Sequence, residues 1–292
     1  MNTDPGTGAT GRAVDKGIGA PPPHPLMGRT FLVRVLSALV LAPLAVLAVY
    51  LGGWIFCALI ILAGLLMLWE WQGITERKSS GLLLAVAAAT LILCAVLVKQ
   101  SYPVAAVSAA GAGLLVVGVT ACLLRRRVIW PVLGLLYVLV PCLSVLWIRA
   151  FPEIGFAICI WMFTIVWATD IGGYIVGASV GGPKLMPRIS PKKTWSGLLG
   201  GIVMAGTVSA VIGLWFDFAI TAKGLFVIAG GLAVVAQAGD LVESALKRHF
   251  GVKDSGHLIP GHGGIMDRVD GLVPVLPVVA AGLWFLQGLD GV

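Results

Sequence analysis

Long apolar runs dominate this chain, and polar residues gather between them. Six stretches carry no formal charge: 35–69, 79–98, 100–124, 128–148, 194–216 and 271–289. A membrane-spanning helix needs roughly 20 mainly apolar residues, and the first stretch is long enough for two, separated near Gly52 and Gly53. We therefore predict about nine membrane-spanning helices, at 31–50, 54–71, 81–98, 103–124, 129–148, 154–177, 198–219, 224–243 and 272–288.

The composition agrees with a membrane protein. Of the 292 residues, 59% are hydrophobic and 11% are charged, and the mean hydropathy is +1.00. A soluble domain usually carries about 25% charged residues. We therefore expect an all-α, polytopic integral membrane protein. Residues 1–28 are rich in Gly, Pro and polar groups, which predicts a disordered tail rather than a signal peptide.

Positive charge is distributed unevenly over the predicted topology. With the N-terminus in the cytoplasm, 17 of the 20 lysines and arginines lie on the cytoplasmic side, and only Lys99, Arg149 and Lys223 lie outside. This split is what the positive-inside rule predicts. It explains the net charge of +7 without a nucleic-acid partner.

Polar clusters that could carry chemistry occur in the second half of the chain, all on the predicted cytoplasmic side. They are 170–174 ("DIGGY"), 181–197 ("GGPKLMPRISPKKTWSG") and 239–271. The first half is hydrophobic helix with one unusual residue, Glu70, which lies between two tryptophans. We interpret Glu70 as an interfacial carboxylate within an aromatic belt, with a functional role as the alternative.

The third cluster begins with a polar helix face. Asp240, Glu243, Ser244 and Lys247 are spaced i, i+3, i+4, i+7, so a helix would carry them on one side. Two interpretations are open. An ion pair from Lys247 to Asp240 or Glu243 could merely solvate the helix end. Alternatively the carboxylates bind a cation, because an acid near a bilayer is costly unless it is paired.

The sequence that follows, "IPGHGGIMDRVDG", favours a phosphate and metal site. Gly263 and Gly264 lack side chains, so a backbone could come close to phosphate oxygens there. Asp240 and Asp267 would supply the oxygen ligands that Mg²⁺ prefers. His262, just before the two glycines, is either structural or catalytic.

Basic side chains that could neutralise a polyphosphate come from two clusters. The third cluster supplies Lys247, Arg248, Lys253 and Arg268. The second supplies Lys184, Arg188, Lys192 and Lys193. A basic loop beside a membrane often serves only as a topology signal or as a contact with anionic headgroups. Three prolines in the loop favour a fixed shape instead, which would suit a phosphate-bearing lipid. Asp170, an acid in an apolar span, is a further functional candidate.

The segment 244–270, "SALKRHFGVKDSGHLIPGHGGIMDRVD", resembles the signature of phosphatidate cytidylyltransferases, also called CDP-diglyceride synthases. That pattern runs S-x-apolar-K-R, four residues, K-D, then a Gly, a Pro and H-G-G before D-R-x-D, and every fixed position is filled. The preceding "GDLVES" and the earlier "SPKKTW" are also similar to the family. One position departs: Ser196 stands where the family usually has Glu, which puts any acidic role there in doubt.

The resemblance implies a helical enzyme of the bilayer, expected as a homodimer. It would convert CTP and phosphatidate to CDP-diacylglycerol and pyrophosphate with Mg²⁺, and K⁺ is a candidate second cation. The family's metal-binding aspartates carry over to Asp240 and Asp267. The other signature residues carry over as nucleotide or phosphate contacts: Ser244, Lys247, Arg248, Lys253, Asp254, His262, Arg268 and Asp270. Among these we assign Lys247, Arg248 and His262 to catalysis with the two aspartates.

The composition and the polar clusters divide the chain into three parts. A cytoplasmic tail at 1–28 would precede N-terminal transmembrane helices at 29–150 and a C-terminal catalytic region at 151–292. The protein would lie in the cell's inner membrane, with its N-terminus and active site in the cytoplasm.

Other classes of protein make different predictions. A transporter or channel for an anion would place ionisable groups at mid-depth in several spans, whereas here they gather at one face. A CTP-dependent lipid-alcohol kinase would share the nucleotide and metal requirements but transfer the γ-phosphate. CDP-alcohol phosphotransferases are disfavoured because their D-G-x-x-A-R motif is absent. The sequence also has no Walker loop and no G-x-S-x-G elbow, so its phosphate chemistry would not use a P-loop.

Overall fold

The computed structural model describes residues 42–76, 80–216, 218–256 and 263–289. The predicted tail at 1–28 lies outside these residues. The helices are Ala42–Leu51, α2 (Gly53–Thr75), α3 (Gly81–Lys99), α4 (Pro103–Leu123), α5 (Ile129–Arg149), α6 (Gly155–Val180), α7 (Trp195–Phe216), α8 (Ala222–His249), α9 (Met266–Val269) and α10 (Leu272–Leu289).

Seven of the described helices, α2 to α8, are long and apolar enough to cross a membrane. This confirms a multi-pass, mainly helical membrane protein. The apolar stretches at Ala42–Leu51 and in α10 are shorter, and the first predicted span begins at residue 31, outside the described residues. The total of nine spans therefore stays a prediction.

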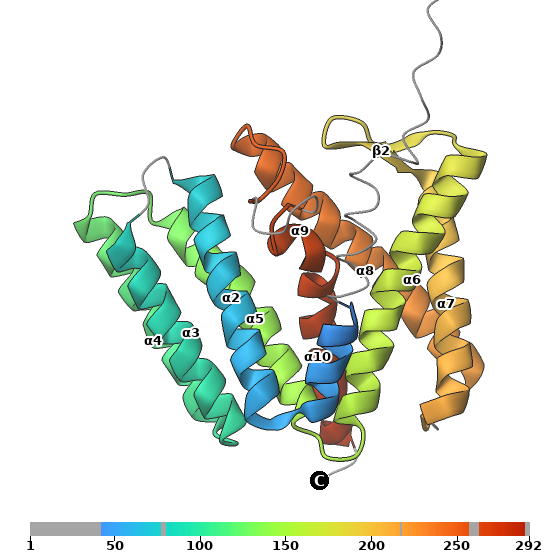
Figure 1. Ribbon diagram of the computed structural model, residues 1–292, viewed down its shortest axis with the longest axis horizontal. Helices are drawn as coiled ribbons and strands as arrows, with labels where there is room; N and C mark the ends of the chain where they lie inside the picture. The colour runs from blue at the N-terminus through green and yellow to red at the C-terminus, as the bar shows by residue number, and fades with distance from the viewer. Residues whose placement is uncertain (1–41, 77–79, 217, 257–262, 290–292) are drawn as a thin grey trace, which may run out of the picture.

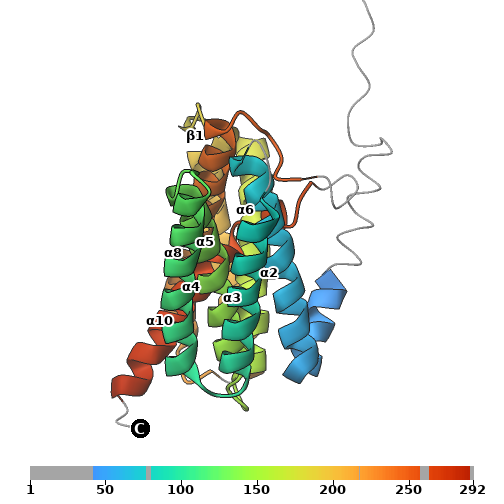
Figure 2. The same ribbon diagram turned by 90° about the vertical axis from the view of Figure 1, so that its left-hand side faces the viewer.

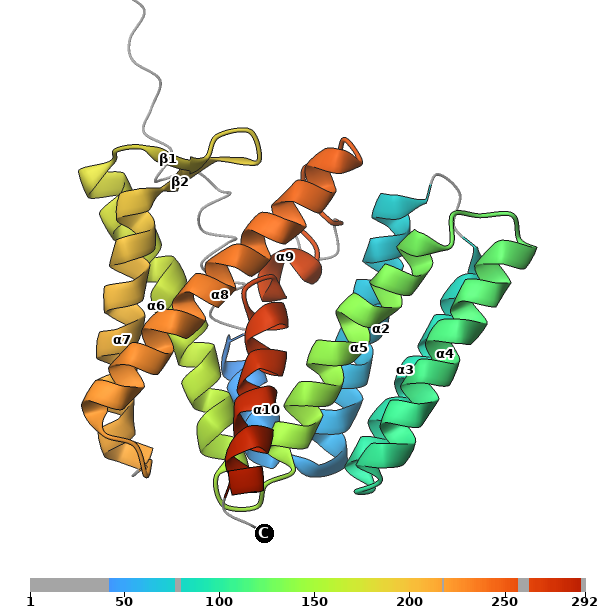
Figure 3. The ribbon, with the colours of Figure 1, turned by 180° about the vertical axis from the view of Figure 1, so that it is seen from behind.

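The helices form two groups with the last elements between them. Figures 1 and 3 show α2, α3, α4 and α5 on one side, α6, α7 and α8 on the other, and α9 and α10 in the middle. Helix α10 packs against α5, α6 and α8. Figure 2 shows the end of α10 opposite the hairpin described below, and Figures 1 and 3 show α8 inclined to α6 and α7.

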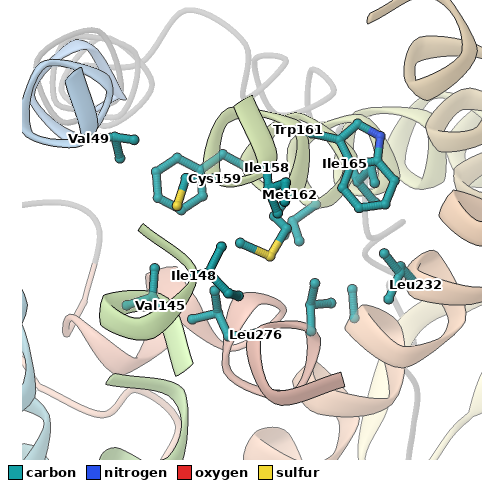
Figure 4. Close-up of a cluster of buried hydrophobic side chains, with 14 of the residues drawn as sticks. Val49, Val145, Ile148, Ile158, Cys159, Trp161, Met162, Ile165, Leu232 and Leu276 are labelled. Carbon is teal, nitrogen blue, oxygen red and sulfur yellow. The ribbon is translucent and has the colours of Figure 1, made fainter. Parts of the chain in front are cut away.

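Two hydrophobic clusters hold these groups together. The first joins α5, α6, α8 and α10, and Figure 4 shows its members Ile148, Met162, Ile165, Leu232 and Leu276. The second lies among α2, α3, α4 and α5, and it also takes in Met266 of α9 and Val273 of α10. Met266 and Val273 therefore anchor α9 and the start of α10 in the core of the N-terminal helices.

The basic loop between α6 and α7 forms a small hairpin. Strands β1 (Lys184–Met186) and β2 (Ser190–Thr194) pair antiparallel, with Lys184 opposite Thr194. Gly181 ends α6 with a φ of 66°, a conformation that glycine adopts without strain. The loop predicted to have a defined shape forms this hairpin, and the rest of the described residues form the helical membrane protein that was expected. The three prolines of this loop would interrupt a helix. The pairing of the two strands instead satisfies the backbone groups of an extended chain.

Candidate active site at one end of the helix bundle

The last turns of α8, strand β2 and the segment after α8 build one polar site. Helix α8 continues past the predicted end at 243 to His249, because its last turns carry a polar face instead of an apolar one. Three basic residues lie in the last turn, Lys247, Arg248 and His249, where positive charge interacts favourably with a helix C-terminus.

Lys247 is the centre of the first group of charges. Its Nζ lies 2.5 Å from Asp267 Oδ1 and 3.0 Å from Glu243 Oε1. None of these three side chains is more than 11% exposed. The predicted polar face of α8 is confirmed, and its ion pairs extend to Asp267 in α9. A buried carboxylate needs such a partner to offset its lost hydration.

Asp267 has further hydrogen-bond partners in addition to Lys247. Its Oδ2 accepts hydrogen bonds from Ser255 N at 2.9 Å, Ser255 Oγ at 2.8 Å and Gly264 N at 2.9 Å. Burial alone would raise the pKa of Asp267, but Lys247 and these backbone donors outweigh it and lower the pKa below its usual value. Asp267 is therefore an ionised carboxylate of fixed orientation.

Asp240 belongs to a second group of charges. Its Oδ2 pairs with Lys193 Nζ of β2 at 2.5 Å, and its Oδ1 accepts a hydrogen bond from Ser244 Oγ at 3.2 Å. The Asp240–Lys247 pair considered from the sequence is not formed, because Lys247 contacts Glu243 and Asp267 instead. The basic hairpin thus reaches the polar face of α8.

Asp270 lies between α9 and α10, close enough to Asp240 to be affected by its charge. Burial, and after it the charge of Asp240, raises the pKa of Asp270 to about 7. The hydrogen bond from Gly271 N to Asp270 Oδ1, at 2.8 Å, opposes this effect. A cation that entered this site would favour the ionised form of Asp270.

Glu70 of α2 is part of the site, and its interpretation as an interfacial carboxylate is wrong. The residue is 2% exposed. Its Oε1 accepts a hydrogen bond from Ile265 N at 2.8 Å, and its Oε2 accepts from Met266 N at 2.8 Å and Ser255 Oγ at 3.2 Å. The signal was present in the sequence, since an acid within an apolar span is a functional candidate. Two flanking tryptophans directed the interpretation to the membrane interface.

Gly263 and Gly264 give room to carboxylates of the protein itself. A Cβ at Gly264 would lie 2.5 Å from both oxygens of Glu70, and one at Gly263 would lie 2.6 Å from Asp267 Oδ2. The need for glycine is thus explained without a phosphate. A contact of these glycines with phosphate oxygens stays a prediction.

Five further residues that were predicted to contact the nucleotide or its phosphates lie at the surface. Arg248 donates a hydrogen bond to Val252 O at 3.2 Å. The exposed members are Lys192, Arg248, Lys253, Asp254 and Arg268. His262 lies outside the described residues. Their contacts with a nucleotide stay predictions.

Ser196, which departs from the family pattern, closes the base of the hairpin. Its Oγ donates a hydrogen bond to Gly181 O and lies 3.0 Å from Thr194 Oγ1. The serine therefore connects the two ends of the basic loop, a role that needs no acidic group.

The two predicted metal ligands, Asp240 and Asp267, are as many carboxylates as a Mg²⁺ ion usually takes from a protein. Among the described residues, no three His, Cys, Asp or Glu side chains are placed to hold a metal ion together. Mg²⁺ usually binds one or two carboxylates and takes its other ligands from water and substrate phosphates. Oδ1 of Asp240 and Oδ1 of Asp267 each accept one hydrogen bond in this structure. Each oxygen has a second acceptor position, so both aspartates can serve as monodentate ligands.

Comparisons with known proteins show the family to which the chain belongs. Residues 32–286 match the model of the cytidylyltransferase family. A protein of Brucella melitensis named phosphatidate cytidylyltransferase is 38% identical over 256 residues, which cover 87% of this chain and 92% of the relative. A protein of Brucella suis with the same name is 37% identical over 263 residues, with the same coverage. The protein of that name from Bacillus subtilis is 45% identical over 142 residues, about half of each chain. The chain therefore belongs to the cytidylyltransferase family of nucleotidyltransferases, which confirms its resemblance to phosphatidate cytidylyltransferases.

Proposed function

We propose that the protein joins CTP and phosphatidate to form CDP-diacylglycerol and pyrophosphate, as the names of its relatives suggest. An oxygen of the lipid phosphate attacks the α-phosphorus of CTP, and the bond from that phosphorus to the β-phosphate oxygen breaks. The lipid phosphate is already a nucleophile, so the reaction needs no strong general base. Its main difficulty is the approach of two anions.

One observation carries this proposal. The pairs Lys193–Asp240 and Lys247–Asp267 join the hairpin and α9, respectively, to α8. Figure 1 shows the hairpin at one end of the helices, with α9 and the last turns of α8 toward that same end. A water-soluble nucleotide and a lipid headgroup would both have access to charges in that position.

The proposed roles follow from the charges. Lys193 and Lys247 would transfer part of their ion pairing from carboxylates to phosphate oxygens as negative charge builds on pyrophosphate. Ser255 and Gly264 would keep Asp267 in one orientation during that transfer. Asp240 and Asp267 would hold Mg²⁺, which when bound would stabilise the attacking and leaving oxygens. K⁺ is the proposed second cation.

Orientation and assembly belong to the same proposal. The excess of basic residues on one side of the predicted topology supports a cytoplasmic N-terminus and active site. Labelling a cysteine introduced at Arg188 with a membrane-impermeant reagent, before and after the cells are opened, would test the orientation. Light scattering of the purified protein would test the expected homodimer.

The reaction itself is tested with the full chain in lipid nanodiscs, supplied with phosphatidate, labelled CTP and Mg²⁺. We expect CDP-lipid and pyrophosphate in equal amounts. The folded variants Asp240→Ala and Asp267→Ala should lose about a hundredfold or more in rate, as expected when an electrostatic contact to the transition state is lost. Activity that survives one substitution would refute the role of that aspartate alone.

Two other outcomes would support other functions. Release of CDP in place of pyrophosphate, with a lipid alcohol as acceptor, would indicate a kinase. A folded parent that makes neither product, but moves an anion across a vesicle membrane, would indicate a transporter.

A further inference from the structure

We infer that Glu70, in the N-terminal helices, is a positioning residue for the active site: it holds Ser255 and the segment 263–266 so that Asp267 meets Lys247. This inference rests on the proposed function, because the segment belongs to the site that would carry the reaction. Glu70 is 2% exposed, so it acts through the segment and not on a substrate.

The contacts of Glu70 define the position of the segment on both sides. Ile265 N and Met266 N each donate to a separate oxygen of the carboxylate, both at 2.8 Å. Ser255 Oγ lies 3.2 Å from Oε2. One side chain of α2 therefore contacts residues that are about ten positions apart in the sequence. The last of them, Met266, directly precedes Asp267. Two backbone donors on a planar carboxylate restrict both distance and rotation, which a single bond would not do.

Ser255 connects Glu70 to Asp267. Its Oγ lies 2.8 Å from Asp267 Oδ2 and 3.2 Å from Glu70 Oε2. A hydroxyl has one hydrogen to donate, and both of its neighbours are acceptors. The hydroxyl therefore lies within hydrogen-bond distance of both carboxylates and donates to one of them at a time. Ser255 is thus a donor that Glu70 and Asp267 share.

The packing leaves little freedom to replace these contacts. A Cβ at Gly264 would lie 2.1 Å from Ser255 Oγ and 2.5 Å from each oxygen of Glu70. Met266, next in the segment, is fully buried in the core of α2, α3, α4 and α5. The backbone therefore approaches the carboxylate as closely as glycine permits, and the apolar core holds it there.

An apolar side chain could not replace Glu70 without leaving its partners unpaired. Buried charges are commonly replaced by apolar side chains of similar size without loss of stability, provided that no partner is left unpaired. Here the partners are two backbone N–H groups and a serine that also serves Asp267. The connection through Ser255 to a predicted catalytic aspartate makes Glu70 a positioning residue.

The test compares Glu70→Gln with Glu76→Gln in the full chain. Both replace an acid by its amide, but Glu76, which directly follows α2, pairs with Arg126 outside the site. We expect Glu70→Gln to lower kcat about tenfold to a hundredfold, the range typical when an outer partner of a ligand is lost. The KM for CTP should change much less, because Glu70 touches no substrate. Glu76→Gln should keep the kcat of the parent.

A second measurement does not depend on activity. Hydrogen–deuterium exchange of the peptide 263–271 reports on the backbone amides that donate hydrogen bonds to Glu70. Exchange should be faster in Glu70→Gln than in the parent, and it should be unchanged in Glu76→Gln. Glu70→Asp keeps a carboxylate and should recover part of the lost kcat, whereas Glu70→Ala should not.

The outcomes separate this inference from the proposed function. An inactive parent would count against the proposed function, and the exchange experiment would still decide whether Glu70 holds the segment. Unchanged exchange in Glu70→Gln would overturn the inference. So would a normal kcat for this variant in an active preparation, or an equal loss of kcat in Glu76→Gln.

Discussion

The N-terminal helices and the region around α8 use their carboxylates in different ways. Directly after α2, Glu76 pairs with Arg126, and α2, α3, α4 and α5 pack mainly through apolar side chains. Around α8, Lys193 and Lys247 pair with three acids. Glu70 is the exception that joins the two regions. The comparison teaches that the N-terminal helices contribute to the site by fixing its backbone.

Loss of Lys247 should have the largest effect. Lys247→Ala would leave Glu243 and Asp267, both nearly buried, without their shared cation. Removing one partner of a buried ion pair typically costs about 3–5 kcal/mol, so we expect a clear drop in the thermal unfolding temperature. We also expect a loss of CDP-lipid synthesis.

Lys223→Ala is the matched control for Lys247→Ala. Lys223 is an exposed lysine near the opposite end of α8, so its loss should change neither quantity. Equal effects of the two substitutions would show that the site region is no more dependent on its ion pairs than the rest of the helix.

Two glycine substitutions compare the regions directly. Gly264→Ala would place a Cβ 2.5 Å from both oxygens of Glu70. Overpacking of this kind typically costs about 1–3 kcal/mol. Gly73→Ala in α2 meets nothing within 4 Å, and alanine favours a helix over glycine by about 1 kcal/mol. We expect Gly264→Ala to unfold at a lower temperature than the parent and Gly73→Ala at a slightly higher one.

Activity should follow the same order for the glycine variants. Gly264→Ala displaces the amide that donates to Asp267, and so it should reduce the rate of CDP-lipid formation. Gly73→Ala should leave the rate unchanged. A Gly264→Ala protein with parental stability and rate would contradict the close approach described for Glu70.

Periodicity and charge were sufficient to predict most of the helices. The spans predicted at 81–98, 103–124 and 129–148 match α3, α4 and α5 within one residue. Such runs are apolar on all sides, and their ends coincide with charges or prolines. The end of α8 was predicted six residues too early, because its last turns are stabilised by ion pairs that a hydropathy criterion does not count.

The site was predicted less completely, for a physical reason. Asp240 and Ser244 are neighbours on one helix face, and this contact follows from their spacing. The partners of Glu70 lie 185 to 196 residues away, and no local pattern encodes that distance. The pairing of Asp240 with Lys193 likewise depends on how the hairpin folds over α8.

The smallest expected effect is a pH dependence that belongs to the site region. Burial, followed by the charge of Asp240, raises the pKa of Asp270 from 3.8 to about 7. The folded protein thus keeps a proton that the unfolded chain releases near pH 4. The contribution of this group to stability is complete at the lowest pH values and is lost as the pH rises through about 7. The unfolding temperature should therefore fall between pH 5.5 and pH 8.

The variant Asp270→Asn should lose part of this dependence, because the amide does not titrate. Measurements without divalent cations isolate the effect, since a bound cation would stabilise the ionised carboxylate. Glu153→Gln, which changes an exposed acid in the connection between α5 and α6, should retain the dependence of the parent. If Asp270→Asn retained it too, the pH-sensitive group would lie elsewhere, and the electrostatic contrast between the two regions would not include Asp270.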